Sequence, residues 1–244
     1  MNQGTYEIIK NRQIAPDVYE MTLEGDTSAL ERPGQFINIK TDGFFLRRPI
    51  SVCDWDDKQL VIIFKVVGAG TMEMSAMKIG KRLDILTGLG NGYDLSLSGK
   101  SPLLLGGGAG VPPLYRLAKE LISQKKHVTA ILGFNKACEI FYEKEFRDIG
   151  CDVYVTTVDG SYGIKGFVTD ALPEEYTYFY TCGPKPMLKA VYNRLKTQGE
   201  FSFEERMGCG FGACMGCSCK VKGGYKRICK DGPVLKKEEI LWED

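Results

Sequence analysis

Cysteines crowd into one glycine-rich stretch near the C-terminus, and this stretch constrains the fold more than any other part of the chain. The 244 residues contain nine cysteines. Five of them lie between residues 209 and 229: Cys209, Cys214, Cys217, Cys219 and Cys229. Because glycine adopts positive φ freely, a segment so rich in it favours tight turns over a helix or a long strand. We therefore expect a loop whose shape depends on what its thiols bind.

The spacing of the first three thiols, C-x4-C-x2-C, is typical of plant-type loops that bind a two-iron, two-sulfur (2Fe–2S) cluster with a fourth cysteine from further along the chain. The expected metal ligands are Cys209, Cys214, Cys217 and Cys229. Two alternatives stay open, a four-cysteine zinc site and disulfides, although structural zinc usually takes pairs of ligands from separate turns. Cys219 is either a neighbouring thiol or the ligand that replaces Cys229.

The overall charge and composition exclude some classes of partner. Lys and Arg number 32 against 31 Asp and Glu, so the chain lacks the basic surface of a nucleic-acid-binding protein. No window is apolar for long enough to span a bilayer, and the N-terminus has no apolar stretch of a secretion signal. Free cysteines in this number suit a reducing compartment. We expect a cytoplasmic protein with small-molecule or protein partners.

Residues 1–99 have the pattern of a small antiparallel β-barrel or sandwich. Apolar and polar residues alternate between residues 6 and 23, with a turn at residues 15–17. Further strands are expected at residues 35–39, 59–65 and 82–86. A short helix is expected at residues 71–79. Short strands separated by Pro, Gly and Asp at close spacing are typical of closed or two-layered β folds.

Two features of this region predict a phosphate-bearing ligand. Arg48 and Ser51 place a cation and a hydroxyl group at the entry to a strand, where they can form charge-assisted hydrogen bonds. Gly70 and Thr71 open the expected helix, whose free N–H groups and dipole attract anions. Each feature alone is also explained by an ordinary turn or helix cap. Together they predict a dinucleotide site.

Residues 100–200 alternate between strand and helix patterns, which predicts a parallel sheet with crossover helices. The expected strands are residues 101–105, 128–132, 152–155 and 178–180. The expected helices are residues 114–123, 140–149, 168–172 and 186–197. Ligands of such sheets bind at the carboxyl ends of the strands.

The glycine loop that follows the first of these strands departs from the usual dinucleotide fingerprint. Depending on the starting glycine, the third glycine position is occupied by Val111 or Pro113. The loop therefore predicts either a pyrophosphate site or close packing of strand and helix. Cys182 ends the last strand. By default such a residue is a buried structural cysteine, but its place beside the crevice favours a residue that lines the nicotinamide position. Asp159 and Ser161 either line the same crevice or form a plain polar turn.

In this order the motifs resemble the ferredoxin reductase family. Arg-x-x-Ser at residues 48–51 and Gly-Thr at residues 70–71 correspond to its FAD motifs. Gly-x-Gly-x-x-Pro at residues 108–113 and Cys-Gly-Pro at residues 182–184 correspond to its nicotinamide cofactor motifs. The chain departs from the common Arg-x-Tyr-Ser form at Ile50, so an aromatic contact to the flavin comes from elsewhere or is absent.

With the cysteine loop added, the chain is similar to the electron-transfer subunits of NAD-linked dihydroorotate dehydrogenases. That resemblance implies an FMN-containing catalytic partner that oxidises dihydroorotate, in a heterotetramer with two of each subunit, within pyrimidine (UMP) biosynthesis. Electrons would pass through the 2Fe–2S cluster and FAD to NAD⁺. The chain has no eight-fold β/α repeat, so the pyrimidine chemistry belongs to the partner.

The resemblance also implies which residues contact the cofactors. The FAD contacts would be Arg48, Pro49, Ile50, Ser51, Lys65, Val66, Val67, Gly70 and Thr71. The NAD contacts would be Gly108, Ala109, Gly110, Val111, Pro112, Cys182, Gly183 and Pro184. No catalytic acid or base is expected, because hydride transfer depends on stacking and distance.

The expected architecture therefore has three domains: an antiparallel FAD-binding β-barrel over residues 1–99, a Rossmann-like parallel α/β NAD domain over residues 100–200, and a small 2Fe–2S domain over residues 201–244. A related alternative is the electron-transfer subunit of a sulfide dehydrogenase or of a ferredoxin–NAD(P) transhydrogenase. An alternative of another class is a zinc-binding adaptor. Lys136 favours NADP and Glu139 opposes it, and the resemblance favours NAD.

Overall fold

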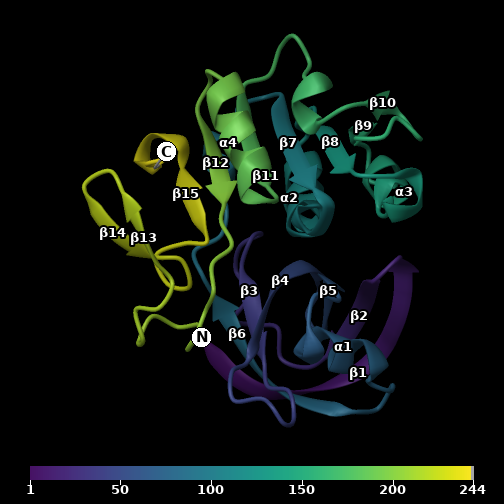
Figure 1. Ribbon diagram of the computed structural model, residues 1–244, viewed down its shortest axis with the longest axis vertical. Helices are drawn as coiled ribbons and strands as arrows, with labels where there is room; N and C mark the ends of the chain where they lie inside the picture. Colours follow the sequence, from purple (N-terminus) through teal and green to yellow (C-terminus); the bar gives the residue numbers. More distant parts are fainter. Residues whose placement is uncertain (243–244) are drawn as a thin grey trace.

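The computed structural model describes residues 1–242, which form a barrel, a sheet flanked by helices, and a smaller C-terminal part (Figure 1). Six antiparallel strands close the barrel in the order β1-β2-β5-β4-β3-β6. Their bounds are β1 Asn2–Ala15, β2 Val18–Glu24, β3 Phe36–Ile39, β4 Arg48–Trp55, β5 Gln59–Lys65 and β6 Arg82–Leu89. Inward-pointing residues such as Ile8, Leu23, Ile37 and Ile62 are fully buried in its interior. The barrel expected from the alternating pattern is confirmed.

The barrel's helix, α1, spans Ala69–Ala76. It begins before the predicted start at residue 71 and ends before the predicted end at residue 79, so those bounds were wrong. Thr71 lies inside the first turn, where its Oγ1 accepts the backbone N–H groups of Val67 at 2.9 Å and Gly68 at 3.2 Å. The helix ends early because Met77 has extended backbone angles. The Gly-Thr pair therefore closes the first turn instead of preceding it.

The second part is a seven-stranded sheet in the order β10-β9-β8-β7-β11-β12-β15, parallel except for β15. The strand bounds are β7 Pro102–Gly107, β8 Thr129–Phe134, β9 Asp152–Thr157, β10 Ile164–Lys165, β11 Tyr178–Cys182, β12 Gly199–Ser202 and β15 Val234–Lys236. The helices are α2 Pro113–Ser123, α3 Glu143–Asp148 and α4 Lys185–Arg194. The predicted parallel α/β unit is confirmed.

Three helix predictions in this part need correction. The predicted helix at residues 140–149 is reduced to α3, because Tyr142 adopts a left-handed φ of 65°. The Tyr142 hydroxyl lies 3.2 Å from Glu20 Oε2 of the barrel, so a tertiary contact accompanies the break. The predicted helix at residues 168–172 is only a 3₁₀ turn, Val168–Asp170. The last helix ends at Arg194 because Leu195 is extended.

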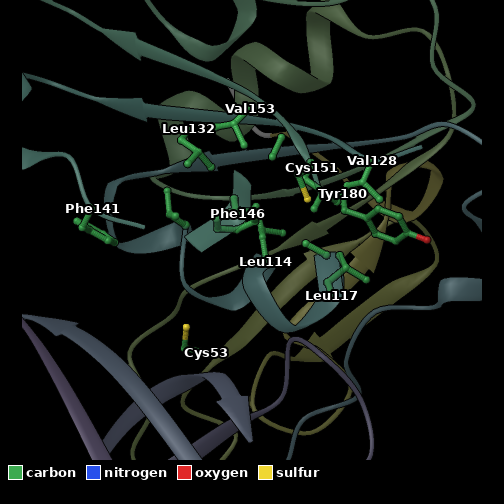
Figure 2. Packing of buried hydrophobic residues seen from close by; sticks show 14 of the residues in the cluster. Cys53, Leu114, Leu117, Val128, Leu132, Phe141, Phe146, Cys151, Val153 and Tyr180 are labelled. Carbon is green, nitrogen blue, oxygen red and sulfur yellow. The ribbon is translucent and has the colours of Figure 1, made fainter. Parts of the chain in front are cut away.

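Helix α2 joins the sheet to the barrel. Figure 2 shows Leu114 and Leu117 of α2 packed beneath sheet residues such as Leu132, with Cys53 of β4 on the barrel side. At the same junction the Arg116 guanidinium lies 4.3 Å from the Trp55 ring centroid and donates to the Trp55 carbonyl oxygen. Apolar packing and these polar contacts therefore hold the barrel against α2.

The C-terminal part consists of the thiol loop, a hairpin of β13 (Ser218–Val221) and β14 (Gly224–Arg227), and a return to the sheet through β15. It lies alongside both other parts (Figure 1). Strand β12 spans the predicted boundary between residues 200 and 201, and β15 pairs with β12, so the C-terminal part and the sheet share strands. Among the described residues, no helix is long and apolar enough to cross a membrane.

Candidate cofactor sites

Arg48 and the N-terminus of α1 form a candidate phosphate site on the barrel. A Cβ atom at Gly70 would lie 2.0 Å from Arg48 Nε, so glycine is what lets the guanidinium approach the helix end. From the other side, Arg48 Cζ lies 4.5 Å from the Phe44 ring centroid, and Nη1 donates to the Leu46 carbonyl oxygen at 2.7 Å. A cation beside the free N–H groups of a helix N-terminus attracts phosphate. The two predicted anion-binding features thus lie together.

The Thr71 hydroxyl serves the turn itself. It accepts two backbone N–H groups and donates to the Gly68 carbonyl oxygen at 3.0 Å. A Cβ atom at Gly68, by contrast, would meet nothing within 4 Å. Thr71 therefore orders the backbone at the helix N-terminus, and the space in front of Gly68 is open to a ligand.

The barrel opens beside the predicted flavin residues. Strand β4 pairs with β3 along residues 48–51 but with β5 only from Val52 onward. Residues 48–51 and the end of β5 therefore separate, and each leaves one strand edge unpaired. The predicted contacts along these two edges are Pro49, Ile50, Ser51, Lys65, Val66 and Val67. All are half-buried or exposed, as a flat ring placed between the edges would require.

The two predicted nicotinamide motifs meet at the carboxyl ends of β7 and β11. A Cβ atom at Gly110 would lie 2.2 Å from the Cys182 carbonyl oxygen, so the loop touches the strand end through glycine alone. Gly108 has a φ of +50°, and a Cβ atom there would meet nothing within 4 Å. Thus Gly110 explains the close-packing interpretation, while the open side at Gly108 fits a ligand. Ala109, Val111, Pro112, Gly183 and Pro184 complete the two turns.

Cys182 is a neutral thiol. Burial raises its pKa to about 12, and a hydrogen bond with Ser202 of β12 offsets only part of that effect. The side chain therefore presents a small uncharged surface at the strand end, which suits contact with a nicotinamide ring.

The turn at residues 159–161 is folded against the end of β8. Ser161 Oγ lies 2.6 Å from Asp159 Oδ1 and accepts the Ala137 N–H at 2.8 Å. Nearby, Glu139 Oε2 accepts from Asn135 Nδ2 at 2.9 Å. Ser161 therefore anchors the start of the 3₁₀ turn Ala137–Glu139, and Asn135 holds the Glu139 carboxylate beyond the carboxyl end of β8.

The four predicted ligand thiols lie in two pairs. The backbone N–H groups of Ala213 and Cys214 donate to Cys209 Sγ at 3.2 and 3.4 Å, and that of Cys209 donates to Cys214 Sγ at 3.4 Å. The backbone N–H of Cys229 donates to Cys217 Sγ at 3.4 Å. The first pair lies in the more exposed part of the loop and the second is buried.

The two pairs differ in their acid–base environment. Partial burial raises the pKa of Cys209, but backbone hydrogen bonds from Cys214, Phe211 and Ala213 outweigh it and lower the pKa to about 6. Burial and the neighbouring Cys217 thiol raise the pKa of Cys229 to about 12. Backbone N–H groups directed at sulfur stabilise a thiolate, the form that binds iron.

The two thiol pairs provide two ligands for each iron of a 2Fe–2S cluster. Within residues 1–242 no group of three His, Cys, Asp or Glu side chains is already gathered closely enough to hold a single metal ion. All nine cysteines are free, and Cys219 lies in β13 opposite Lys226, outside both pairs.

Two residues that the sequence reading missed brace the loop. Arg227 Nη1 donates to the Gly212 carbonyl oxygen at 3.0 Å and its Nε donates to Asp231 at 3.0 Å. Asn38 of β3 donates to the Cys209 carbonyl oxygen at 3.1 Å. A polar residue inside the apolar strand Phe-Ile-Asn-Ile was the one sequence signal that pointed to Asn38.

Comparison with known proteins identifies the C-terminal part and the sheet. Residues 204–241 match the iron–sulfur cluster binding domain of dihydroorotate dehydrogenase B, and residues 104–193 match the oxidoreductase NAD-binding domain. A solved structure of an NADH-dependent reduced ferredoxin-NADP oxidoreductase superimposes with a TM-score of 0.87 at 32% identity, covering 97% of this chain and 90% of that one. The ferredoxin reductase fold is thereby confirmed.

Full-length relatives agree. The chain is 42% identical to the dihydroorotate dehydrogenase B (NAD(+)) electron transfer subunit of Shouchella clausii, with 98% of each covered. It is 45% identical to the protein of the same name from Fusobacterium nucleatum, with 95% of each covered. With its NAD-binding and iron–sulfur domains, this oxidoreductase chain belongs to the family of dihydroorotate dehydrogenase B electron transfer subunits.

Proposed function

We propose that this chain carries electrons from a dihydroorotate-oxidising partner through a 2Fe–2S cluster and FAD to NAD⁺. The observation that carries the proposal is the order of the three sites. The thiol loop contacts β3, β3 pairs with residues 48–51, and β5 on the other side of the barrel opening packs near the Gly108–Gly110 turn. A flavin in the opening would have the cluster on one side and the nicotinamide on the other.

The chain's own residues perform binding and orientation. Arg48 and the N-terminus of α1 would neutralise the FAD phosphates, and residues 49–51 and 65–67 would line the flavin. The loop at residues 108–112 and the turn at residues 182–184 would hold the nicotinamide against it. Cys209, Cys214, Cys217 and Cys229 would hold the two irons. A bound flavin supplies the conversion between single electrons and a hydride.

NAD is the preferred nicotinamide cofactor in this proposal. Glu139 is fixed at the end of β8 by Asn135, and an acidic residue at the corresponding place of a dinucleotide-binding sheet accepts from the ribose 2′-hydroxyl. The same carboxylate would repel a 2′-phosphate. Lys136, the cation considered for that phosphate, precedes the 3₁₀ turn Ala137–Glu139 and is exposed.

The partner would be an FMN-containing catalytic subunit that oxidises dihydroorotate to orotate in pyrimidine biosynthesis, joined to this chain in a cytoplasmic heterotetramer. The support is the subunit name of the relatives, together with apolar side chains around the thiols. Phe211 is 43% exposed, Met215 55% and Tyr225 73%. Exposed apolar residues beside a redox centre mark a docking face for a protein.

The test is an anaerobic absorbance titration with NADH, with iron, zinc and flavin assayed on the same sample. Flavin and iron–sulfur bands that both bleach with NADH support the proposal. Dihydroorotate should then reduce NAD⁺ only after the FMN subunit is added. A colourless protein that contains zinc would overturn the proposal in favour of an adaptor.

A second candidate keeps the cofactors and exchanges the partner for ferredoxin. It is favoured by the 0.87 TM-score to the reduced ferredoxin-NADP oxidoreductase structure. Against it, each thiol pair consists of two cysteines, with no carboxylate in a ligand position. Reduction of NAD(P)⁺ by reduced ferredoxin in the presence of this chain, but not by dihydroorotate with the FMN subunit, would establish this candidate.

A further inference from the structure

Asn38 connects the barrel to the thiol loop through a single amide. Its side chain is buried, with 2% of its surface exposed, and Nδ2 donates to the Cys209 carbonyl oxygen at 3.1 Å. Gly210, the residue after Cys209, has a φ of +82°, and a Cβ atom there would lie 2.3 Å from Asn38 Nδ2. The loop backbone is therefore pressed onto the amide, and only glycine permits the approach.

The same residue borders the flavin opening. In the β3–β4 ladder Asn38 is paired with Pro49, between the partners of Arg48 and Ile50. Its neighbours Ile37 and Ile39 are fully buried in the barrel core, so Asn38 points to the opposite face of the strand. That face carries the thiol loop. Asn38 thus lies between the predicted flavin residues and one cluster ligand.

The orientation of the amide is fixed by its partner. Only Nδ2 can donate to a carbonyl oxygen, so turning the amide over would place two acceptors against each other. Its Oδ1 is buried without a hydrogen-bond partner among the described residues. A buried polar atom left unpaired in this way is uncommon and calls for a reason. The Nδ2 bond to the Cys209 carbonyl oxygen is thus kept although Oδ1 has no partner within the described residues.

We propose that Asn38 is a positioning residue for electron transfer, which fixes the Cys209 end of the cluster loop against the flavin-bearing strands. The proposal rests on the proposed function, because it needs both cofactors. In the direction started by NADH, a hydride brings two electrons and one proton to the flavin, and one electron then reduces the cluster. Asn38 is expected to affect the second step and not the first.

The test compares Asn38→Leu, which keeps the side chain's size and removes the donor, with Asn91→Ala in the cofactor-loaded protein. Asn91 Nδ2 donates to the Val234 carbonyl oxygen at 2.8 Å, so its loss also loosens the C-terminal part from the barrel, but at a different place. After rapid mixing with NADH, flavin bleaching reports hydride transfer, and the electron paramagnetic resonance signal of freeze-quenched samples reports the reduced cluster.

We expect Asn38→Leu to slow cluster reduction by about tenfold while flavin bleaching stays within about twofold, since small misplacements of a redox partner are costly. Hydrogen–deuterium exchange should also rise in residues 208–212, and the resonance line shape should change. Asn38→Ala provides the same readouts if leucine overpacks the site. Asn91→Ala should leave all four readouts near wild type.

Three results would overturn the proposal. One is wild-type cluster reduction and exchange in Asn38→Leu and Asn38→Ala. Another is an equal slowing of both steps, which would make Asn38 a structural barrel residue. The third is an equal effect of Asn91→Ala, which would indicate general loosening. A wild-type protein without flavin or iron is distinguishable from all three, because it overturns the proposed function first and this inference with it.

Discussion

The thiol loop and the loop at residues 108–112 are both glycine-rich turns near a cysteine, but their glycines serve different ends. At Gly110 the missing Cβ allows the loop to touch the backbone of Cys182. In the thiol loop, Gly210 and Gly212 adopt φ values of +82° and +93°, which side chains rarely allow. There the positive φ turns successive N–H groups toward sulfur. The sheet loop uses Gly110 for close contact, whereas the thiol loop uses glycine for the direction of its N–H groups and, at Gly210, also for contact with Asn38.

The cysteines of the two loops also differ in the pKa of their thiols. Burial raises the pKa of Cys182 to about 12, whereas backbone N–H groups outweigh burial at Cys209 and lower its pKa to about 6. The adjacent glycines alone would not separate the two cases. At Cys209 the backbone N–H groups aimed at the sulfur favour the thiolate, whereas at Cys182 desolvation keeps the half-buried thiol neutral.

The largest effect is expected when one thiol of the exposed pair in the thiol loop is removed. Cys214→Ser should abolish the cluster's absorbance and paramagnetic signal, because the exposed pair loses a thiolate that the hydroxyl group does not replace. Flavin bleaching by NADH should continue, since the sheet site is intact. The matched control is Cys219→Ser in the same loop, which should retain the cluster. A cluster retained in Cys214→Ser, or lost in Cys219→Ser, would contradict the assigned pairs.

The next effect tests how strongly burial shifts the pKa of Glu200, a carboxylic acid in the sheet. Burial raises the pKa of Glu200 in β12 from 4.5 to about 7, while the Asp94 N–H at 2.9 Å and Lys236 oppose the shift and the charges of Asp94 and Glu239 add to it. The pKa of Glu200 is higher in the folded protein than in the unfolded chain. The stability that depends on a neutral Glu200 is therefore fully present below pH 4.5 and is lost as pH rises to about 7.

Glu200→Gln should therefore be more stable than wild type at pH 8 by up to about 3 kcal/mol, at about 1.4 kcal/mol for each pH unit between the two pKa values. The two proteins should be equally stable near pH 4.5. Urea unfolding at both pH values measures the difference. Equal stability at pH 8 would show that Glu200 is solvated in the folded protein.

The third effect breaks the contact made by glycine in the sheet loop. Gly110→Ala places a Cβ atom 2.2 Å from the Cys182 carbonyl oxygen and must push the two nicotinamide motifs apart. We expect the rate of flavin reduction by NADH to fall on the order of a hundredfold, equal to about 2.7 kcal/mol. The cluster spectrum should be unchanged. Unchanged flavin reduction would remove Gly110 from the nicotinamide site.

The sequence predicted what local spacing encodes. The thiol ligands, the glycine turns and the strand–helix alternation each depend on residues close together in the chain, and these predictions led to the correct fold. The predicted start of α1 was wrong because Thr71 caps the backbone from the third position of the helix, whereas the prediction placed it at the first. The break at Tyr142 was missed because its hydroxyl contacts Glu20, which is distant in sequence.

The site contacts that escaped prediction are of the same kind. Asn38 and Cys209 are separated by 171 positions, and no periodicity relates them. The addition of β15 to the sheet likewise depends on the path of the whole C-terminal part. Motifs therefore predicted residues for each cofactor site, but the arrangement of these candidate sites relative to one another required the structure.

The smallest effect sharpens the assignment of the sheet loop as the nicotinamide site. Glu139→Gln keeps an acceptor for Asn135 Nδ2, now 2.9 Å from Glu139 Oε2, but removes the charge. NADPH use relative to NADH, compared as kcat/KM for flavin reduction, should rise by about tenfold, or about 1.4 kcal/mol. Glu143→Gln is the matched control, because it removes an equal charge from α3, where the carboxylate pairs with Arg147 at 2.9 Å. If both variants shift the ratio equally, the effect is one of net charge, and Glu139 does not face the 2′ position. If only Glu139→Gln shifts it, the end of β8 contacts the ribose, and the loop that uses glycine for contact binds the nicotinamide half of the same molecule.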